Sequence, residues 1–320
     1  MSWHGICLSA LPGESRKNGY IGVEWEGRVI IPLGRRSPAF KLQSREAQIG
    51  DLRIHYQVGG TGKPIVFIHG LGGSTRWWSR NVEAFARRYR VYVVDLVGFG
   101  ASQCGHPFVL ADAASYLSRW MTRVGIQQAT VVGHSMGGYI AAELAADYPH
   151  KVDKLILVDA AAAPFDPSYV KTAVGMVSSL RSTPLSLLSV MVTDSYKAGP
   201  RTIVKAAMEL KNTDLRAKLR RIQAPTLIVW GENDTVTPRK MADVLRQAIP
   251  GAEFKLMKRV GHSPMWERPA EFNQTLLHFL GEAPAILRTA RTSLPPRDPW
   301  PHLVRTLNRL DEYVEQSRAS

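Results

Sequence analysis

The chain has 320 residues, of which 45% are hydrophobic and 21% charged, so it can bury one large core or two smaller ones. Its two cysteines exclude a disulfide framework, and no apolar run reaches the roughly 18 residues that a membrane span needs. The net charge of +14 is spread along the chain without a basic run interleaved with aromatic residues, so nucleic acid is not an expected partner.

Residues 1–40 form an N-terminal extension without a periodic pattern. Glycines and prolines interrupt it throughout, so neither a long helix nor a long strand is expected there. Its first thirty residues contain three glutamates and no continuous apolar segment, and a secretory signal is therefore not predicted. This composition favours a cytoplasmic protein.

A regular pattern begins at residue 41. The segments 40–49 and 52–58 alternate between polar and apolar residues, which predicts a hairpin that turns at Gly50 and Asp51. Short apolar runs, typical of strands buried on both faces of a parallel sheet, follow at 64–68, 91–94, 130–132, 155–158 and 226–230.

Helical patterns separate most of these runs, at 77–89, 110–124 and 136–148. Strands that alternate with helices predict an α/β fold, in which helices cover both faces of a mostly parallel sheet. We expect the core of this fold to comprise residues 41–162 and 223–282.

The interval 163–222 breaks the alternation. It contains helical patterns at 168–180, 185–193 and 200–219 but no clear buried strand, so it predicts a helical lid over the carboxyl edge of the sheet. Between residues 164 and 221, ten Lys and Arg outnumber four Asp and Glu. A C-terminal extension, 283–320, follows the core, and nothing in the sequence indicates an oligomeric state.

The segment Gly133-His134-Ser135-Met136-Gly137 lies between a predicted buried strand and a helix rich in small residues. A sharp turn from strand to helix places the serine hydroxyl above the sheet, and glycines on both sides make room for neighbouring backbone. The turn also points the Met136 amide and the positive end of the helix at the same space. Ser135 is therefore the predicted nucleophile.

A serine hydroxyl needs a base to remove its proton, and that base needs an acid to orient it. His262 follows the late strand predicted at 252–257 and is the predicted base. Asp234 lies just beyond the strand 226–230 and is the predicted acid, with Glu232 and Asp159 as rivals. The order Ser135, Asp234, His262 is the order expected when a G-x-S-x-G motif supplies the nucleophile.

The glycine-rich segment 69–74 follows the first parallel strand. Its glycines let the chain turn beneath a bound substrate, so that the Leu71 amide completes an oxyanion hole with the amide of Met136. A second glycine-rich segment, 95–102, lacks the lysine of a phosphate-binding loop and predicts a structural turn near the pocket.

Five short motifs thus occur in order: His69-Gly70, Asp95-x-x-Gly98-x-Gly100-x-Ser102, Gly133-His134-Ser135-Met136-Gly137-Gly138, Gly231-x-x-Asp234 and Gly261-His262. Together they resemble the α/β-hydrolase superfamily, in particular its single-lid bacterial branch of serine esterases, lactonases, monoacylglycerol lipases and C–C hydrolases. The resemblance covers about residues 45–282. It implies a sheet of eight strands, a helical lid at 163–222 and oxyanion donors at Leu71 and Met136.

A serine nucleophile excludes the dehalogenases and epoxide hydrolases that this superfamily builds on an aspartate. The expected reaction is hydrolysis of a small-to-medium carboxylic ester through an acyl-enzyme, with no cofactor and no metal. C–C bond hydrolysis, lactone hydrolysis and slow-turnover ligand binding remain alternatives. Trp77, Trp78 and Met191 are predicted to line the substrate pocket, although such side chains are equally typical of a core.

Overall fold

A computed structural model describes residues 40–102, 108–161 and 183–282. The chain divides into two compact units, Met1–Gln43 and Ser44–Ser320, and the fold described here is that of the second. The two predicted extensions and the predicted helix at 168–180 lie outside the described residues.

The core is an eight-stranded sheet, as predicted. Its strands are β1 (Gln43–Ile49), β2 (Leu52–Gly59), β3 (Lys63–Ile68), β4 (Tyr89–Val94), β5 (Ala129–His134), β6 (Val152–Val158), β7 (Thr226–Gly231) and β8 (Glu253–Met257). They lie in the order β1-β2-β4-β3-β5-β6-β7-β8. Strand β2 runs antiparallel to β4, and the pairs from β4 across to β8 are parallel.

The apolar runs of the sequence form the centre of this sheet. Val66 and Phe67 on β3 are fully buried, and so are Val131 and Val132 on β5. Neighbouring residues of a strand point to opposite faces, so both faces of these strands must be covered.

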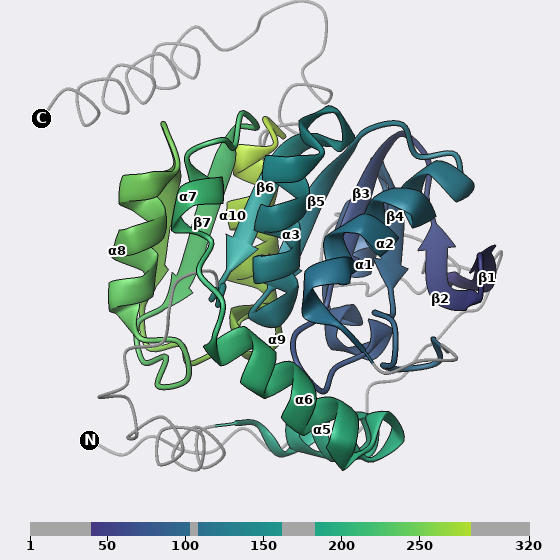
Figure 1. Cartoon of the computed structure of the whole chain (residues 1–320). Coiled ribbons are helices and arrows are strands. Elements are labelled where there is room, and N and C mark those ends of the chain that lie inside the picture. The colour runs from purple at the N-terminus through teal and green to yellow at the C-terminus, as the bar shows by residue number, and fades with distance from the viewer. Residues whose placement is uncertain (1–39, 103–107, 162–182, 283–320) are drawn as a thin grey trace, which may run out of the picture. The chain divides into compact units, whose positions relative to one another are not determined.

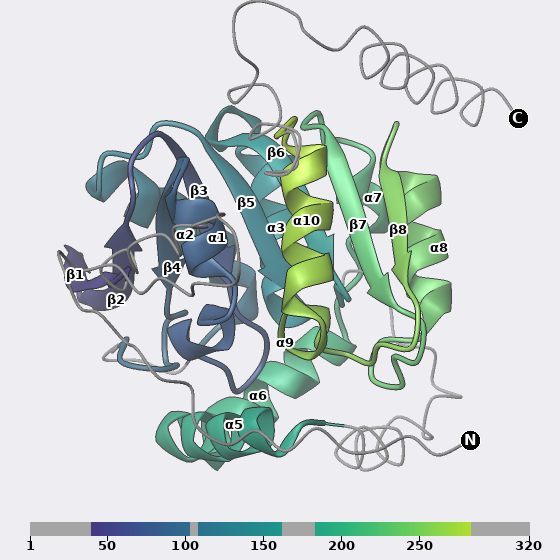
Figure 2. The ribbon, with the colours of Figure 1, turned by 180° about the vertical axis from the view of Figure 1, so that it is seen from behind.

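Helices cover both faces (Figures 1 and 2). One face carries α2 (Leu110–Arg123), α3 (Met136–Asp147), α7 (Arg216–Leu219) and α8 (Arg239–Ala248), and the other carries α1 (Val82–Ala86) and α10 (Pro269–Phe279). The short helix α9 (Pro264–Glu267) precedes α10, and single turns η1 (Thr75–Trp78) and η2 (Pro149–Lys151) precede α1 and β6.

Two predicted helices are interrupted in the structure. The segment 77–89 gives η1 and then α1, and the buried Asn81 side chain between them donates to the Met265 carbonyl and to Asn273. The segment 200–219 breaks into α6 (Pro200–Lys211) and α7, where Thr213 and Asp214 bond the local backbone. Short polar side chains compete with helical hydrogen bonds in this way.

The inserted helices α5 (Leu185–Ala198) and α6 lie at the carboxyl edge of the sheet (Figure 1). An ionic contact joins α5 to the core through a buried carboxylate, that of Asp194, which is only 1% exposed. Its two carboxylate oxygens accept hydrogen bonds from the Ser74 hydroxyl at 2.7 Å and from the Arg76 guanidinium. Arg80 bonds Ser186 near the start of the same helix at 3.1 Å. Within the described ranges, no helix is long and apolar enough to span a bilayer.

The contact between Arg76 and Asp194 yields a stability prediction. Arg76→Ala leaves the buried Asp194 carboxylate without its cation, and we expect the free energy of unfolding to fall by about 2 kcal/mol. This is less than for a fully buried ion pair, because the arginine itself is half-exposed. The matched control is Arg87→Ala, which removes an exposed i,i+4 pair with Glu83 and is expected to change stability by less than about 0.5 kcal/mol. Urea denaturation measures both, and equal losses would contradict the anchoring role of Asp194.

Candidate active site

Ser135 stands at a sharp turn between β5 and α3. Its backbone is in the left-handed region, with φ of +53°, which is uncommon for a residue other than glycine. The turn is held from both sides, since the Ser135 amide donates to the Val158 carbonyl of β6 at 2.9 Å and its own carbonyl accepts from Gly138 and Ala161. Strain of this kind persists only where the surrounding structure imposes it, and it is typical of functional sites.

Two glycines make this turn sterically possible. A Cβ atom on Gly133 would lie 2.3 Å from the carbonyl oxygen of Gly137, and one on Gly137 would lie 2.4 Å from that of His69. Both distances are far below van der Waals contact. The glycines therefore let α3 leave β5 at a steep angle and pass close to the end of β3.

His262 and Asp234 come together beyond the ends of β8 and β7. The Nδ1 atom of His262 lies 2.8 Å from Oδ2 of Asp234, whose side chain is completely buried. The rival acid Glu232 points elsewhere and accepts the Arg259 amide at 2.9 Å. The structure thus brings His262 together with Asp234 and not with Glu232.

The Asp234 carboxylate is surrounded by donors. Its Oδ1 accepts the amides of Val236 and Thr237 at 2.8 and 3.0 Å, and its Oδ2 also accepts the Thr237 hydroxyl. Burial alone would raise the pKa of Asp234, but the neighbouring His262 and these hydrogen bonds hold it below its ordinary value. Asp234 is therefore an anion placed to fix the His262 tautomer with a proton on Nδ1.

Glu267 of α9 holds the backbone on both sides of His262 by hydrogen bonds. Its two carboxylate oxygens accept the amides of Gly261 and Ser263, the residues on either side of the histidine, at 2.8 and 3.1 Å. The sequence analysis did not single out Glu267. A glutamate five positions after a histidine is too common a spacing to predict this contact.

His134 links Ser135 to His262. Its ring centroid lies 4.8 Å from that of His262, and its Nε2–H donates to the His262 carbonyl at 2.7 Å. Complete burial, with the nearby His262 as a second cause, lowers the pKa of His134 to about 3. The ring is therefore neutral at physiological pH and supports His262 without a competing charge.

The glycine-rich segment after β3 lies next to the serine. His69 orients it, because its Nδ1–H donates to the Gly70 carbonyl at 2.8 Å and its Nε2 accepts the Leu96 amide at 3.0 Å. The Leu71 amide donates to no partner among the described residues, and Met136 is the first residue of α3, where amides lack partners inside the helix. Neither predicted oxyanion donor thus has a hydrogen-bond acceptor in the part of the chain that the structure describes.

The segment 95–102 is a structural turn, as predicted. The Asp95 carboxylate accepts the Thr75 amide at 2.6 Å and the Ala101 amide at 2.9 Å, and it lies 2.8 Å from Nδ1 of His55. A Cβ on Gly100 would lie 2.2 Å from this carboxyl group, so the turn closes tightly around it. The amides of Thr75 and Ala101 are thus already occupied by a carboxylate and do not offer a phosphate site.

The three predicted pocket residues lie in different surroundings. Trp77 is buried with its ring 5.6 Å from that of His134, so it borders the site. Trp78 is fully buried and packs in the core against Phe67 and Phe272. Met191 is half-buried on α5.

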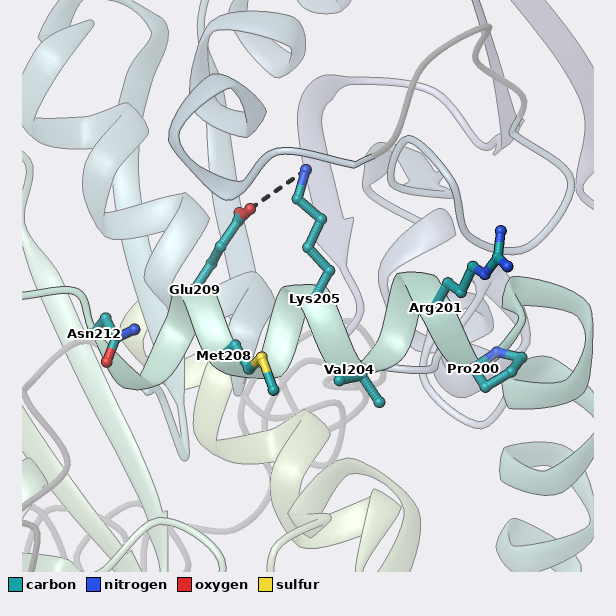
Figure 3. A pocket seen from close by; sticks show the side chains of 7 residues that line it. All are labelled: Pro200, Arg201, Val204, Lys205, Met208, Glu209 and Asn212. Atoms are coloured by element: carbon teal, nitrogen blue, oxygen red, sulfur yellow. Dashed lines mark ion pairs between the residues drawn. The ribbon is translucent and has the colours of Figure 1, made fainter.

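Two hollows of the structure lie away from these residues. One of about 530 Å³ follows the outer face of α6 from Pro200 to Asn212, where Lys205 pairs with Glu209 (Figure 3). The other, of about 1010 Å³, is lined by residues of α1, β7, β8 and α10. Neither includes a residue of the predicted triad.

His134, Asp159 and His262 also offer nitrogen and oxygen atoms within 4.8 Å of one another. Such donor types bind metals. However, Nδ1 of His262 is already bonded to Asp234. A cation on the other nitrogen of His262 would compete with its predicted role as the base.

Comparison with known proteins agrees with this fold. The model of the family described as "Alpha/beta hydrolase family" matches residues 65–275. A 2-hydroxy-6-oxononadienedioate/2-hydroxy-6-oxononatrienedioate hydrolase of Paraburkholderia phymatum is 31% identical over 72% of this chain and 92% of its own.

Solved structures show the same likeness. An N-acyl homoserine lactone degrading enzyme aligns with a TM-score of 0.65 and 28% identity, over 73% of this chain and all of its own. A membrane phospholipase A aligns with a TM-score of 0.67 and 26% identity, over 75% of this chain and 86% of its own.

The low pKa of His134 predicts how stability depends on pH. Between pH 6.5 and 3 the unfolded chain, with an ordinary imidazole, binds a proton that the folded chain does not, so stability falls as pH falls through this window. At pH 4.5, two units below 6.5, His134 accounts for up to about 2.7 kcal/mol of this loss. His134→Asn should flatten the curve of unfolding free energy against pH below 6.5. Parallel curves for wild type and variant would contradict the assignment.

Proposed function

Since this chain belongs to the α/β-hydrolase family, we propose that it is a serine hydrolase that cleaves the carbon–carbon bond beside a ketone in a carboxylate-bearing substrate. The observation that carries the mechanism is the placement of Ser135 on a strained turn, with His262 held by Asp234 at 2.8 Å and joined to that turn through His134. Ser135 is the proposed nucleophile, His262 the base and Asp234 the acid.

The first half-reaction forms an acyl-enzyme. Ser135 Oγ bonds to the ketone carbon while His262 takes its proton, and the Leu71 and Met136 amides bind the negative oxygen that develops. When the tetrahedral intermediate collapses, the carbon–carbon bond breaks and its electron pair passes to the leaving carbon. Such a group departs readily only where a neighbouring conjugated carbonyl spreads that charge, and the imidazolium of His262 then supplies the proton.

The second half-reaction releases the acid. His262 takes a proton from water, the hydroxide adds to the acyl carbon, and Ser135 leaves with the proton returned by the imidazolium. One water is consumed, with its hydroxyl on the acid product and its hydrogen on the carbon fragment. Asp234 keeps its charge throughout and steadies each imidazolium.

The preference for this substrate class over a simple ester has two supports. The relative from Paraburkholderia phymatum, which aligns over 92% of its own length, carries the name of an oxo-dioate hydrolase. The inserted helices are also basic, with eight Lys and Arg against three Asp and Glu between residues 183 and 222, which suits an anionic substrate. These points favour C–C hydrolysis over the ester hydrolysis that the sequence first suggested.

Hydrolysis of a lactone or ester is the second candidate. The structural likeness to an N-acyl homoserine lactone degrading enzyme, at 28% identity, favours it. The same Ser135, His262 and amide donors would act, and the leaving group would be an oxygen that His262 protonates.

A substrate panel decides between the two. Purified protein and Ser135→Ala are assayed on a 2-hydroxy-6-oxo-dienedioate, an N-acyl homoserine lactone and p-nitrophenyl esters of increasing chain length. We expect the highest kcat/KM on the dienedioate and a loss of about 10⁴-fold or more in the variant. Higher kcat/KM on a lactone or ester would replace the C–C assignment, and full activity of Ser135→Ala would overturn the serine mechanism itself.

A further inference from the structure

A carboxyl group that is not part of the proposed triad lies close to it. Asp159, directly after β6, is fully buried, and one of its oxygens lies within 4.8 Å of ring nitrogens of His134 and His262. Its backbone has φ of +43°, a conformation that Asp and Asn tolerate better than other side chains. The structure therefore accepts local strain where it places this carboxyl group.

The two oxygens of Asp159 have different surroundings. Oδ1 accepts the Gly231 amide at 2.9 Å, which ties Asp159 to the end of β7, three residues before Asp234. Oδ2 is buried without a hydrogen-bond partner among the described residues. The Thr237 hydroxyl, which bonds Asp234, also lies 3.2 Å from the Asp159 carbonyl, so both acids share one set of neighbours.

Two carboxyl groups in one dry site do not both ionise readily. Burial, followed by the charge of Asp234, raises the pKa of Asp159 well above its ordinary value, whereas the pKa of Asp234 is lowered. The other titratable groups that face Asp159 are Glu267, His134 and His262. Asp234 therefore loses its proton first, and Asp159 keeps its proton to a higher pH.

We propose that Asp159 is a positioning residue and the second member of a two-carboxyl cradle under His262, with Asp234 ionised and Asp159 protonated in the resting site. The pair acts as a unit, so that Asp159 takes over the negative charge when Asp234 is lost. This inference rests on the proposed serine mechanism but not on the identity of the substrate.

The cradle predicts strong non-additivity between the two acids. If Asp159 replaces the charge of Asp234, removing Asp234 alone costs far less than removing both. Asp159→Asn is the matched substitution, because asparagine tolerates the same backbone conformation, keeps an acceptor for the Gly231 amide and cannot ionise. Asp234→Ala removes the charge without placing an amide against Nδ1 of His262.

The experiment measures the rate at which diisopropyl fluorophosphate phosphorylates Ser135, a reaction that needs the base and the acid but no natural substrate. We expect a fall of less than about 10-fold in Asp159→Asn, about 10²-fold in Asp234→Ala and about 10⁴-fold in the double variant, the loss typical of a triad without its acid. Glu143→Gln, a buried acid of α3 paired with Lys218 outside the site, is the control and should label at the wild-type rate.

Two outcomes overturn the inference. If the labelling rate of Asp234→Ala is as low as that of the double variant, Asp159 takes over no charge. If the labelling rate of Asp159→Asn is equally low, Asp159 is the principal acid. If wild type itself is not labelled, the serine mechanism fails instead.

An infrared spectrum tests the protonation state independently of activity. We expect the carbonyl band of a buried carboxylic acid at pH 8 in wild type, its loss in Asp159→Asn and its loss in Asp234→Ala, where Asp159 ionises. A band that persists in Asp159→Asn, or that is unchanged in Asp234→Ala, would also overturn the cradle. If Asp159 had only a structural role, its protonation would not depend on residue 234.

Discussion

The turn between β5 and α3 sets the positions of Ser135 and of the Met136 amide. Its left-handed backbone at Ser135 is possible because Gly133 and Gly137 let β3, β5 and α3 approach more closely than side chains would permit. The same turn places His134 against His262 and starts α3 at the Met136 amide. The packing of three elements thus determines where the proposed nucleophile and one proposed oxyanion donor lie.

Around this turn, the site confines charge to few atoms. His69 and His134 are buried with lowered pKa values, so their rings serve as neutral hydrogen-bonding supports. Asp234 collects three donors besides His262, while the pKa of Asp159 is raised beside it. The Asp234 carboxylate thus faces Nδ1 of His262 in buried surroundings, where a low dielectric strengthens their hydrogen bond.

The inserted helices are held to this machinery by ionic contacts and close packing. Asp194 of α5 reaches the Ser74 hydroxyl and the Arg76 guanidinium, which follow the predicted oxyanion segment. A Cβ on Gly72 would lie 2.7 Å from the Ser195 hydroxyl, so the helix also packs directly on that segment. A movement of α5 would therefore displace the segment that carries the predicted oxyanion donor Leu71, because tightly packed groups cannot shift independently.

The sequence alone predicted the sheet, its eight strands, and Ser135, His262 and three candidate acids near the ends of strands, because apolar runs and glycine motifs are local signals. It did not determine which of Asp159, Glu232 and Asp234 faces His262, since all three follow or lie near strand ends. Only the tertiary structure decided that, by pairing Glu232 with the Arg259 amide and burying Asp159 behind Asp234. Folding likewise decided that Glu267 bonds the amides on either side of His262. It also decided where the helices near Asn81 and Thr213 are interrupted, because the partners of these two side chains come into place only in the folded chain.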